Sequence, residues 1–443
     1  MSTFEYIITS FREYLWSFPM LFLLFGTHVY FTIRTGFIQR RLPEGIALSI
    51  AGAGRGKKGK GMNVSPYSAL ATALAATIGT GNIVGISTAI AIGGPGAVFW
   101  CWLTGLFGVA TCYAECFLSV KYRRKNPDGS VCGGPMYVLE QGLGKRGMAA
   151  AFALFTVIAS LGVGSSVQAH AIRTAVEQQI MISPQVIGIV TGVLAGLVII
   201  GGSRQIARVC TWLVPIMSVL YLGGCLGLIM INHAVLPKAV SAIVTGAFSS
   251  RAVLGGVAGR TVMACIRTGI SRGLFTNEAG LGSIPMAAAT AETTDAVRQG
   301  LISMTGPFWD TVVMCAVTGI AFVGSMLNHP GSYVGKSPEE MCFVAFGELP
   351  IGGSVLLSIS LALFAFATII GWNVYGTAAV RYLWGETGIK SYQVLYMLSA
   401  YFGAVLSMEI VWGLSDLFNS FMAIPNLLCL WMLQREVFWG LDR

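Results

Sequence analysis

Charged residues are scarce in this chain of 443 residues, and their scarcity excludes most soluble folds. Asp, Glu, Lys and Arg make up 11% of the sequence, whereas apolar residues make up 55% and the mean hydropathy is +0.72. A soluble domain of average composition has about twice that share of charge. So few polar side chains cannot cover a surface that faces water, and we expect an all-α polytopic membrane protein.

The sequence also lacks the patterns that bind resident metals or build hydrolytic sites. The ten cysteines form no CxxC pair, and Cys112 and Cys116, one turn apart on an apolar helix, are explained by packing. No serine or cysteine nucleophile has a matching histidine and acid. We expect free thiols, no metal site, no cofactor and no enzymatic activity. Packing or loop positions are expected for His28, His170, His233 and His329.

Basic residues gather in two short segments. The first lies between Arg40 and Lys60 and the second between Lys121 and Arg146. Such clusters follow the positive-inside rule, so both loops are expected in the cytoplasm, and the net charge of +9 does not indicate a nucleic-acid partner. The N-terminus lacks the basic start and small-residue cleavage site of a secretory signal, so the first span is expected to be retained.

Apolar runs of membrane-spanning length recur along the whole chain, and Gly, Pro and charge mark their ends. Eleven spans are expected, at 16–36, 66–93, 97–121, 148–174, 184–201, 208–231, 257–290, 299–325, 351–381, 391–409 and 413–434. An odd number places the N-terminus outside and the C-terminus in the cytoplasm. The acidic segment 326–350 is then outside, and arginines within 232–290 suggest an outer amphipathic stretch followed by a broken span.

Two of these spans are interrupted at corresponding places. Without the extra N-terminal helix, the rest of this single transporter domain divides into 66–232 and 257–434, two halves of five spans that run in opposite directions. Each half opens with a helix broken by glycine and small polar residues, TIGTGNIVG at 77–85 and GLFTNEAGLGS at 273–283. Broken helices at matching positions of inverted halves indicate the binding site of a transporter.

The stretch TIGTGNIVG has three interpretations. A dinucleotide loop needs GxGxxG after a strand, whereas Gly79, Gly81 and Gly85 give GxGxxxG with no strand before it. A packing seam between helices would use Gly81 and Gly85 alone. An unwound segment also explains the threonines and the asparagine, because freed carbonyls bind a small cation and freed N–H groups face a carboxylate. A zwitterionic amino acid with Na+ would satisfy such a site.

Several long motifs make the chain similar to a known family. They are SPYSALATALAATIGTGNIVGISTAIAIGGPGAVFW, AECFLSVKYR, GGPMYVLEQGLG, GLFTNEAGLGSIPMAAATA and IGWNVYGTAAVRYLWG. Over residues 16–434 the chain resembles the alanine/glycine:cation symporter family of the amino acid-polyamine-organocation superfamily. The resemblance implies eleven spans, a LeuT-type 5+5 inverted repeat with one extra N-terminal helix, and symport of alanine or glycine with Na+ or sometimes H+.

The same resemblance assigns residues to the site. It implies substrate contacts at Thr80, Gly81, Gln168, Phe275, Asn277 and Trp372, and cation contacts at Gly79, Asn82, Thr276 and Thr368. Phe275 would be an apolar wall, Gln168 a polar contact on the fourth span and Trp372 the aromatic floor of the pocket. An interhelical hydrogen bond remains the alternative for Gln168, and ordinary packing for Trp372. Ser358 and Ser360 remain alternatives to Thr368.

Three acids fall inside predicted spans, where an ionisable side chain usually has a partner or a role. Glu278 either balances a cation or an amino group, or caps the second half-helix as an N-terminal acid. Glu115 is expected to be structural. Asp310 is expected to face the interior, where it pairs with Arg267 or Arg272 or takes up a proton.

These observations predict a multi-pass symporter in the plasma membrane of a bacterium or archaeon, surrounded by lipid. Na+ orders the broken helices, a small neutral amino acid binds beside it, and a four-helix core made of 66–93, 97–121, 257–290 and 299–325 rocks against the other helices. Glutamine, serine or D-alanine as the substrate, and H+ as the coupling ion, remain alternatives. A channel would show rings of charge or repeated filter loops. The oligomeric state is not indicated.

Overall fold

The computed structural model describes residues 18–52, 64–125, 131–249, 262–406 and 408–441. The first residues of the expected spans 16–36 and 257–290, and the basic residues at 55–60, lie outside this part. The described residues are almost entirely helical. Two short strands, β1 (Arg124–Lys125) and β2 (Val131–Cys132), pair in antiparallel fashion.

The helices follow one another with short connections. They are α2 (Phe18–Arg34), α3 (Leu42–Gly52), α4 (Pro66–Thr77), α5 (Val84–Gly93), α6 (Ala97–Lys121), α7 (Pro135–Tyr137), α8 (Arg146–Leu161), α9 (Val167–Glu177), α10 (Pro184–Ile199), α11 (Gly202–Ile231), α12 (Leu236–Gly246), α13 (Val262–Asn277), α14 (Ile284–Ala288), α15 (Ala296–Ser303), α16 (Thr305–Pro307), α17 (Ala316–Asn328), α18 (Pro338–Gly347), α19 (Gly353–Trp384), α20 (Thr387–Val405), α21 (Met408–Met432) and α22 (Gln434–Leu441).

Short segments of other helical types connect several of these. The 3₁₀ turns are η1 (Ile38–Arg41), η2 (Thr80–Asn82), η5 (His233–Val235) and η7 (Pro330–Tyr333), and the π-helical segments are η3 (Val138–Gly142), η4 (Gly162–Ser166) and η6 (Phe308–Cys315). Segment η4 joins α8 to α9, and η6 lies between α16 and α17. A π-helical turn changes which side chains share a helix face, and such turns are frequent at functional sites.

Five helical segments of the described part are long and apolar enough to cross a membrane by themselves. They are residues 97–121, 146–177, 202–231, 296–328 and 353–384. Two pairs of helices that meet at a short, sharp bend, 70° after Arg34 and 58° after Thr77, raise the number to seven if each pair is one span. The chain is therefore a multi-pass membrane protein. The count of eleven spans stays a prediction.

One expected loop is helical. Residues 37–65 were expected to form a cytoplasmic loop, but Leu42–Gly52 forms α3, which follows left-handed backbone at Gly36 (φ 64°) and Phe37 (φ 63°). A Cβ atom at Gly45 would lie 2.3 Å from the carbonyl oxygen of Leu301. Only glycine allows α3 to pack this closely on α15, and this contact explains why a short helix forms here.

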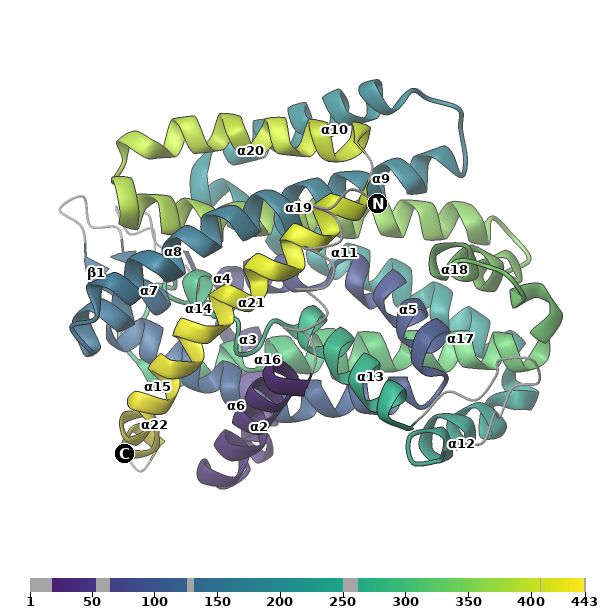
Figure 1. Ribbon diagram of the computed structural model, residues 1–443, viewed down its shortest axis with the longest axis horizontal. Coiled ribbons are helices and arrows are strands. Elements are labelled where there is room, and N and C mark those ends of the chain that lie inside the picture. Colours follow the sequence, from purple (N-terminus) through teal and green to yellow (C-terminus); the bar gives the residue numbers. More distant parts are fainter. Residues whose placement is uncertain (1–17, 53–63, 126–130, 250–261, 407, 442–443) are drawn as a thin grey trace.

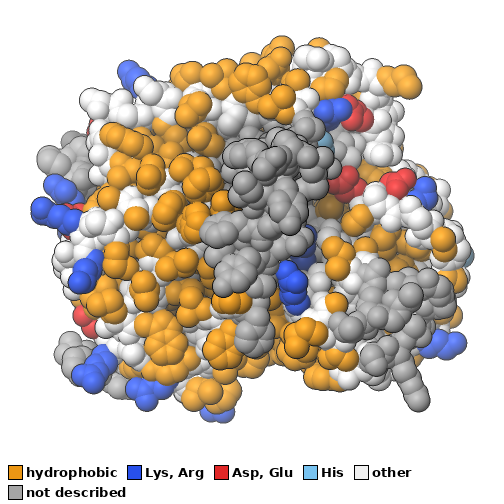
Figure 2. All heavy atoms as spheres, viewed as in Figure 1, with side chains coloured by type: hydrophobic (Ala, Val, Ile, Leu, Met, Phe, Trp, Pro, Cys, Tyr) orange, Lys and Arg blue, Asp and Glu red, His pale blue; other side chains and the backbone are white. Residues whose placement is uncertain are grey.

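The arrangement of the helices separates two ends from an apolar middle. In Figure 1, α12 and α18 lie at one end of the molecule and α7, β1 and α22 at the other, while α10 and α20 run side by side along one edge. Figure 2 shows hydrophobic side chains over the middle of one face, with Lys and Arg mostly toward its margins. Exposed apolar residues on α10 and α11 include Ile189, Val193, Leu197, Trp212, Val219 and Met230. An exposed apolar belt of this kind suits contact with lipid.

Candidate functional site

The first helix break lies between α4 and α5, where the sequence predicts it. Ile78 (ψ 90°) and Gly79 (φ −134°, ψ −157°) have extended backbone, and Thr80–Asn82 form the 3₁₀ turn η2. The side-chain oxygen of Asn82 accepts a hydrogen bond from the backbone N–H of Gly79 at 2.9 Å. This bond satisfies a donor that the helix no longer uses, so Asn82 stabilises the unwound backbone.

Asp310 positions Asn82. The amide nitrogen of Asn82 donates to Oδ1 of Asp310 at 2.7 Å and to its backbone oxygen at 3.0 Å, while Thr311 donates to Oδ2 of Asp310 at 2.6 Å. Asp310 is fully buried on the π-helical segment η6, as its expected place in the interior requires. Its pairing with an arginine stays a prediction.

Gln168 and Thr368 approach the first break from two other helices. The Thr80 hydroxyl donates to Oε1 of Gln168 at 3.3 Å, and the Gln168 amide donates to the backbone oxygen of Val163 in η4 at 3.1 Å. A Cβ atom at Gly79 would lie 2.7 Å from the Thr368 hydroxyl oxygen, so glycine is required for this approach. The structure therefore brings Gly79, Thr80, Gln168 and Thr368 together.

The second break separates α13 from α14, and it begins slightly later than the sequence suggests. Phe275, Thr276 and Asn277 lie in the last turn of α13, and residues 278–283 are unwound. This loop has left-handed backbone at Glu278 (φ 54°), Gly280 (φ 86°) and Gly282 (φ 83°). Such backbone is ordinary for glycine and costs energy for glutamate, so Glu278 is a strained residue held by its contacts.

The two breaks meet at Gly81. A Cβ atom at Gly81 would lie 3.4 Å from the Thr276 hydroxyl oxygen and 3.7 Å from the Phe275 ring. Asn277 turns toward its own backbone instead, because its oxygen accepts from the N–H of Ala279 at 3.0 Å and its amide donates to Thr104 at 3.2 Å. Asn277 therefore ends α13.

Trp372 and Glu278 connect the second break to α19. The indole N–H of the fully buried Trp372 donates to Oε1 of Glu278 at 3.0 Å, and the Ser283 hydroxyl donates to Oε2 at 2.5 Å. Ser283 is the residue directly before α14. Both oxygens of Glu278 thus accept hydrogen bonds from side chains, one on α19 and one directly before α14. The capping role considered from the sequence stays a prediction. Balancing a cation stays a prediction.

Glu115 holds the same loop from α6. Its Oε1 accepts from the backbone N–H of Gly282 at 3.1 Å and from the Asn426 amide at 2.5 Å, and that amide also donates to the backbone oxygen of Gly280 at 2.9 Å. Asn426 belongs to α21. Glu115 therefore links three elements at the second break, which agrees with the structural role expected for it.

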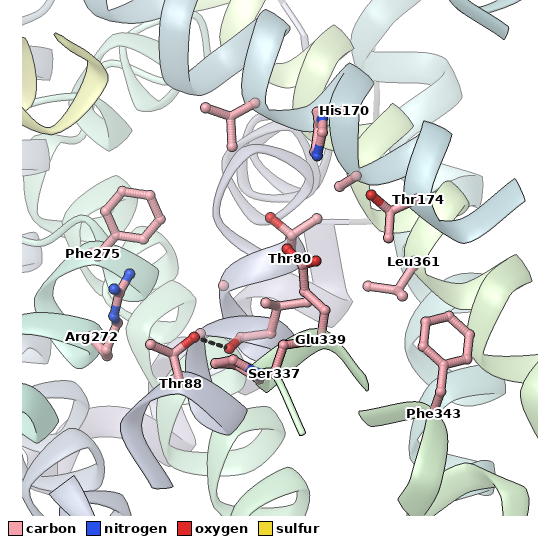
Figure 3. A pocket seen from close by; sticks show the side chains of 16 residues that line it. Thr80, Thr88, His170, Thr174, Arg272, Phe275, Ser337, Glu339, Phe343 and Leu361 are labelled. Carbon is pink, nitrogen blue, oxygen red and sulfur yellow. Dashed lines mark hydrogen bonds between the residues drawn. The ribbon is translucent and has the colours of Figure 1, made fainter. Parts of the chain in front are cut away.

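A cavity of about 360 Å³ opens beside the first break. It is lined by Thr80, Gly81, Val84, Gly85, Thr88, Val167, His170, Ala171, Thr174, Arg272, Phe275, Ser337, Pro338, Glu339, Phe343 and Leu361. Figure 3 shows Thr80 and Phe275 on it, with His170 and Thr174 from α9 and Glu339 from the segment that begins α18. Pockets of this size with a few polar groups commonly bind small molecules.

The lining matches the expected residues in part. Thr80, Gly81 and Phe275 line the cavity, and Gln168 lies beside it through Thr80. Asn277 and Trp372 are not among the lining residues, so their expected contact with substrate stays a prediction and is not present in this conformation. Trp372 is instead bonded to the second break.

Gly85 argues against a packing seam at the first break. No neighbouring atom lies within 4 Å of a Cβ atom built at this position, and Gly85 lines the cavity. A residue in a close helix seam would contact the partner helix there. Gly81 does approach α13, so a seam interpretation applies to one glycine of the pair only.

Several residues that line the cavity were not predicted from the sequence. On α9 they follow a helical period, since Val167, His170, Ala171 and Thr174 share one face. Gln168 lies next to this face, and Ala171 follows it by one turn. Glu339 lies in the first turn of α18, a short helix outside the predicted spans, so the sequence gives no sign that it reaches the cavity. Partial burial beside the cavity raises the pKa of the Glu339 carboxyl above its ordinary value, although the residue also remains exposed to solvent.

Two threonine hydroxyls are suited to a cation. Thr276 donates to the backbone oxygen of Arg272 at 2.6 Å and Thr368 to that of Phe364 at 3.0 Å. Each hydroxyl thereby donates its hydrogen bond within its own helix, so the lone pairs of its oxygen remain available to a cation. Within the described ranges no group of three or more His, Cys, Asp or Glu residues is placed to hold a metal ion.

Comparisons with known proteins agree with this geometry. The sequence profile of the sodium:alanine symporter family matches residues 1–442. The sodium/alanine symporter AgcS of Methanococcus maripaludis is 40% identical over 442 residues, 98% of this chain and 96% of that protein. The probable sodium/glutamine symporter GlnT of Bacillus subtilis is 35% identical over 439 residues, 99% of this chain and 90% of that protein.

A solved structure has the same fold. The crystal structure of MhsT in complex with L-phenylalanine aligns with a TM-score of 0.62 at 13% sequence identity, and the alignment covers 85% of this chain and 91% of that one. At this identity the likeness concerns the fold alone.

Proposed function

The chain belongs to the sodium:alanine symporter family, and we propose that it couples Na+ entry to the uptake of small neutral amino acids, alanine and glycine. The observation that carries this proposal is that the first helix break and the last turns of α13, directly before the second break, line one cavity. Thr80 and Gly81 come from the first break and Phe275 from the last turn before the second. Breaks in two halves that face one site are the arrangement by which transporters bind a charged substrate within the membrane.

The amino acid lies at the deep end of the cavity in this proposal. Its carboxylate faces the backbone N–H groups at the start of η2, where a helix N-terminus favours negative charge. Gln168 orients the polar end through Thr80, to which it is hydrogen bonded. Phe275 packs against the alanine methyl group and restricts larger side chains.

Na+ binds beside the substrate. The Thr368 hydroxyl and the backbone near Gly79 form one side of the cation site, since these groups lie against each other. Thr276 supplies a second hydroxyl near Gly81, and Asn82 holds the backbone between them. Bound Na+ thereby favours the conformation of the first break that also receives the amino acid, which is the condition for coupling.

Alternating access follows from the way the breaks are connected. We assign eleven spans, ten of them in the inverted 5+5 arrangement, with the N-terminus outside and the C-terminus in the cytoplasm. The cavity then faces the outside, where α18 and its Glu339 lie at its mouth. Rocking of α4–α6 and α13–α17 against α8–α10, α19 and α20 closes this side and opens the other.

Glutamine is the second candidate substrate. The cavity reaches beyond Thr80 to the polar side chains of His170, Arg272 and Glu339, and it is larger than alanine requires. An amide side chain would find hydrogen-bond partners there. The relative GlnT, whose name refers to glutamine, gives this alternative a specific competitor to test.

Uptake of labelled alanine into proteoliposomes tests the proposal. We expect accumulation that an inward Na+ gradient drives and that unlabelled alanine and glycine abolish. Glutamine, serine and D-alanine serve as competitors, and an imposed pH gradient without Na+ tests H+ as the driving ion. Lack of alanine accumulation under both gradients would reject the assigned substrate, and stronger competition by glutamine would replace it.

A further inference from the structure

The three buried acids of the interior differ in how well they are satisfied. Asp310 accepts hydrogen bonds on both carboxylate oxygens, and so does Glu278. Glu115 accepts hydrogen bonds on Oε1 only, and its Oε2 is buried without a partner. None of the ion pairs found in the described part of the chain includes Glu115.

A histidine with the same property lies on the other side of the loop. His28 on α2 is fully buried, its Nδ1 lies 2.8 Å from the Thr111 hydroxyl, and its Nε2 has no partner. Thr111 precedes Glu115 by one turn of α6. His28 also lies against the second break, because its Cε1 is 3.5 Å from a Cβ atom built at Gly280.

Glu115 and His28 therefore both contact the loop 278–283, and each has one polar atom without a hydrogen-bond partner. In His28 this atom, Nε2, lies toward Gly108 of α6, 3.7 Å from a Cβ atom built there. Asn426 connects Glu115 to Gly280 on one side, and His28 packs against Gly280 on the other. An ionised carboxylate without a cation is very costly at this depth, whereas a protonated carboxyl group is neutral and carries a donor. A buried carboxylate oxygen without a partner, one turn along α6 from the threonine that contacts a buried imidazole, is suited to bind a proton.

We propose that Glu115 and His28 form a proton-binding site at the second break, with the proton carried on Oε2 of Glu115 in the conformation described here. The step is a simple transfer. A hydronium ion on the opening side gives a proton to Oε2: one of its O–H bonds breaks, the O–H bond of the carboxyl group forms and a water molecule is left. The carboxyl O–H bond breaks again when the proton returns to a water molecule, which becomes hydronium. His28 is a positioning residue, because its ring packs against Gly280 of the loop and against Gly108 and Thr111 of α6, the helix that carries Glu115.

The titratable groups around Glu115 do not offer a positive charge that could compensate its ionised carboxylate in place of a proton. Those that face Glu115 are Cys112 on its own helix, Glu278 on the second break and Cys429 on α21. None of them carries a positive charge that would pair with an ionised Glu115. A proton is therefore the compensation that the described surroundings leave open.

The consequence for transport rests on the proposed function. When the helices rock, the loop 278–283 separates from Asn426 and water reaches Glu115, which then ionises. Low pH thus favours the conformation described here, and high pH favours the opposite one. For a single proton, the balance between the two conformations shifts about tenfold per pH unit where Glu115 is protonated in one and ionised in the other.

Infrared spectroscopy of the reconstituted full-length protein tests the site without transport. A protonated carboxyl group has a carbonyl stretching band that an ionised carboxylate or an amide lacks. We expect this band in the wild type at neutral pH and its loss in Glu115→Gln. Glu140→Gln, at a partly exposed residue paired with Arg146, is the matched control and retains the band. Identical spectra of wild type and Glu115→Gln would overturn the proposal.

A pH profile of Na+-driven uptake tests the consequence. Wild-type uptake changes severalfold across the neutral range, whereas Glu115→Gln transports at a rate that no longer depends on pH, and His28→Asn shifts the profile. Glu115→Asp keeps a carboxyl group, so we expect its uptake to depend on pH as in the wild type. This variant still tests the proposal if Glu115→Gln fails to fold. A wild-type profile in Glu115→Gln, or no pH dependence in the wild type, contradicts the proposal. Absence of wild-type uptake rejects the proposed function alone, because the infrared band is measured without it.

Discussion

The indole N–H of Trp372 donates a hydrogen bond to Oε1 of Glu278, 3.0 Å away, and this bond joins the long helix α19 to the second helix break. Both side chains are buried. An aromatic residue that the family resemblance places at the floor of the pocket thus also holds the strained residue that opens the loop.

Removal of the indole N–H by Trp372→Phe is expected to destabilise the protein. The ring is largely kept, but Oε1 of Glu278 loses its donor, and an unsatisfied buried acceptor costs about 1–3 kcal/mol. We expect a lower thermal unfolding midpoint in detergent. Trp212→Phe on α11 is the control, because Trp212 is 72% exposed. Equal midpoints for the two variants would show that the bond contributes nothing.

Gln168→Ala is expected to weaken alanine binding about tenfold, or about 1.4 kcal/mol, because Thr80 loses the partner that orients it. Na+ binding without alanine changes less, since Gln168 acts on the substrate side. Equilibrium binding of labelled alanine at saturating Na+ measures the effect. Gln393→Ala on α20 provides the control, and unchanged affinity in Gln168→Ala would mean that its bond to Thr80 is only an interhelical contact.

Thr368→Val tests the cation site with almost no change of shape. Valine lacks the hydroxyl oxygen that lies against Gly79, so we expect Na+ to bind about tenfold more weakly, while alanine affinity recovers at high Na+. The dependence of uptake on Na+ concentration measures the apparent affinity for Na+. Thr377→Val, further along the same helix α19, is expected to behave like the wild type. Loss of alanine affinity at every Na+ concentration would instead indicate a substrate contact.

Glu339 is expected to make Na+ affinity sensitive to acid. Burial raises the pKa of Glu339, whereas hydrogen bonds from the Ser337 backbone and from Lys336 lower the pKa of the neighbouring Glu340. As the pH falls, Glu339 therefore becomes neutral first, and the mouth of the cavity loses one negative charge that attracts Na+. We expect the apparent Na+ affinity to fall about twofold to threefold, by screened Coulomb attraction.

The matched pair Glu339→Gln and Glu340→Gln checks this expectation. Uptake is measured against Na+ concentration at neutral and at mildly acidic pH. Glu339→Gln is expected to show the lower Na+ affinity at both pH values, and Glu340→Gln to follow the wild type, because glutamine can keep the cap at Ser337. If Na+ affinity still falls at acidic pH in Glu339→Gln, the protonation of another group causes the fall.

The helix breaks were predictable from the sequence because glycine and small polar residues interrupt apolar runs at both places. The family resemblance, carried by the motifs around these breaks, predicted Thr80, Gly81 and Phe275 as site residues, and all three line the cavity. The partners across space were not predictable. Trp372 lies on a helix that is apolar all round, so no period indicates which way its side chain points.

Other features have no local signal at all. The π-helical segments η4 and η6 rotate the helix faces that carry Gln168 and Asp310, and hydrophobic periodicity cannot reveal such a turn. The helix α3 forms because Gly45 packs on α15, a tertiary contact. Glu339 reaches the cavity from the first turn of α18, a short helix between two spans whose position depends on the packed fold.

Gly85 has a consequence for how transporters of this kind can diversify. Its missing side chain leaves space that belongs to the cavity and to no neighbouring helix. An alanine there would add one methyl group to the wall without displacing an atom, so the cavity would shrink while the helix packing stayed the same. If the cavity is the substrate site proposed above, we expect substrate size to be separable from fold stability at this position, with Gly85→Ala narrowing the range of amino acids carried.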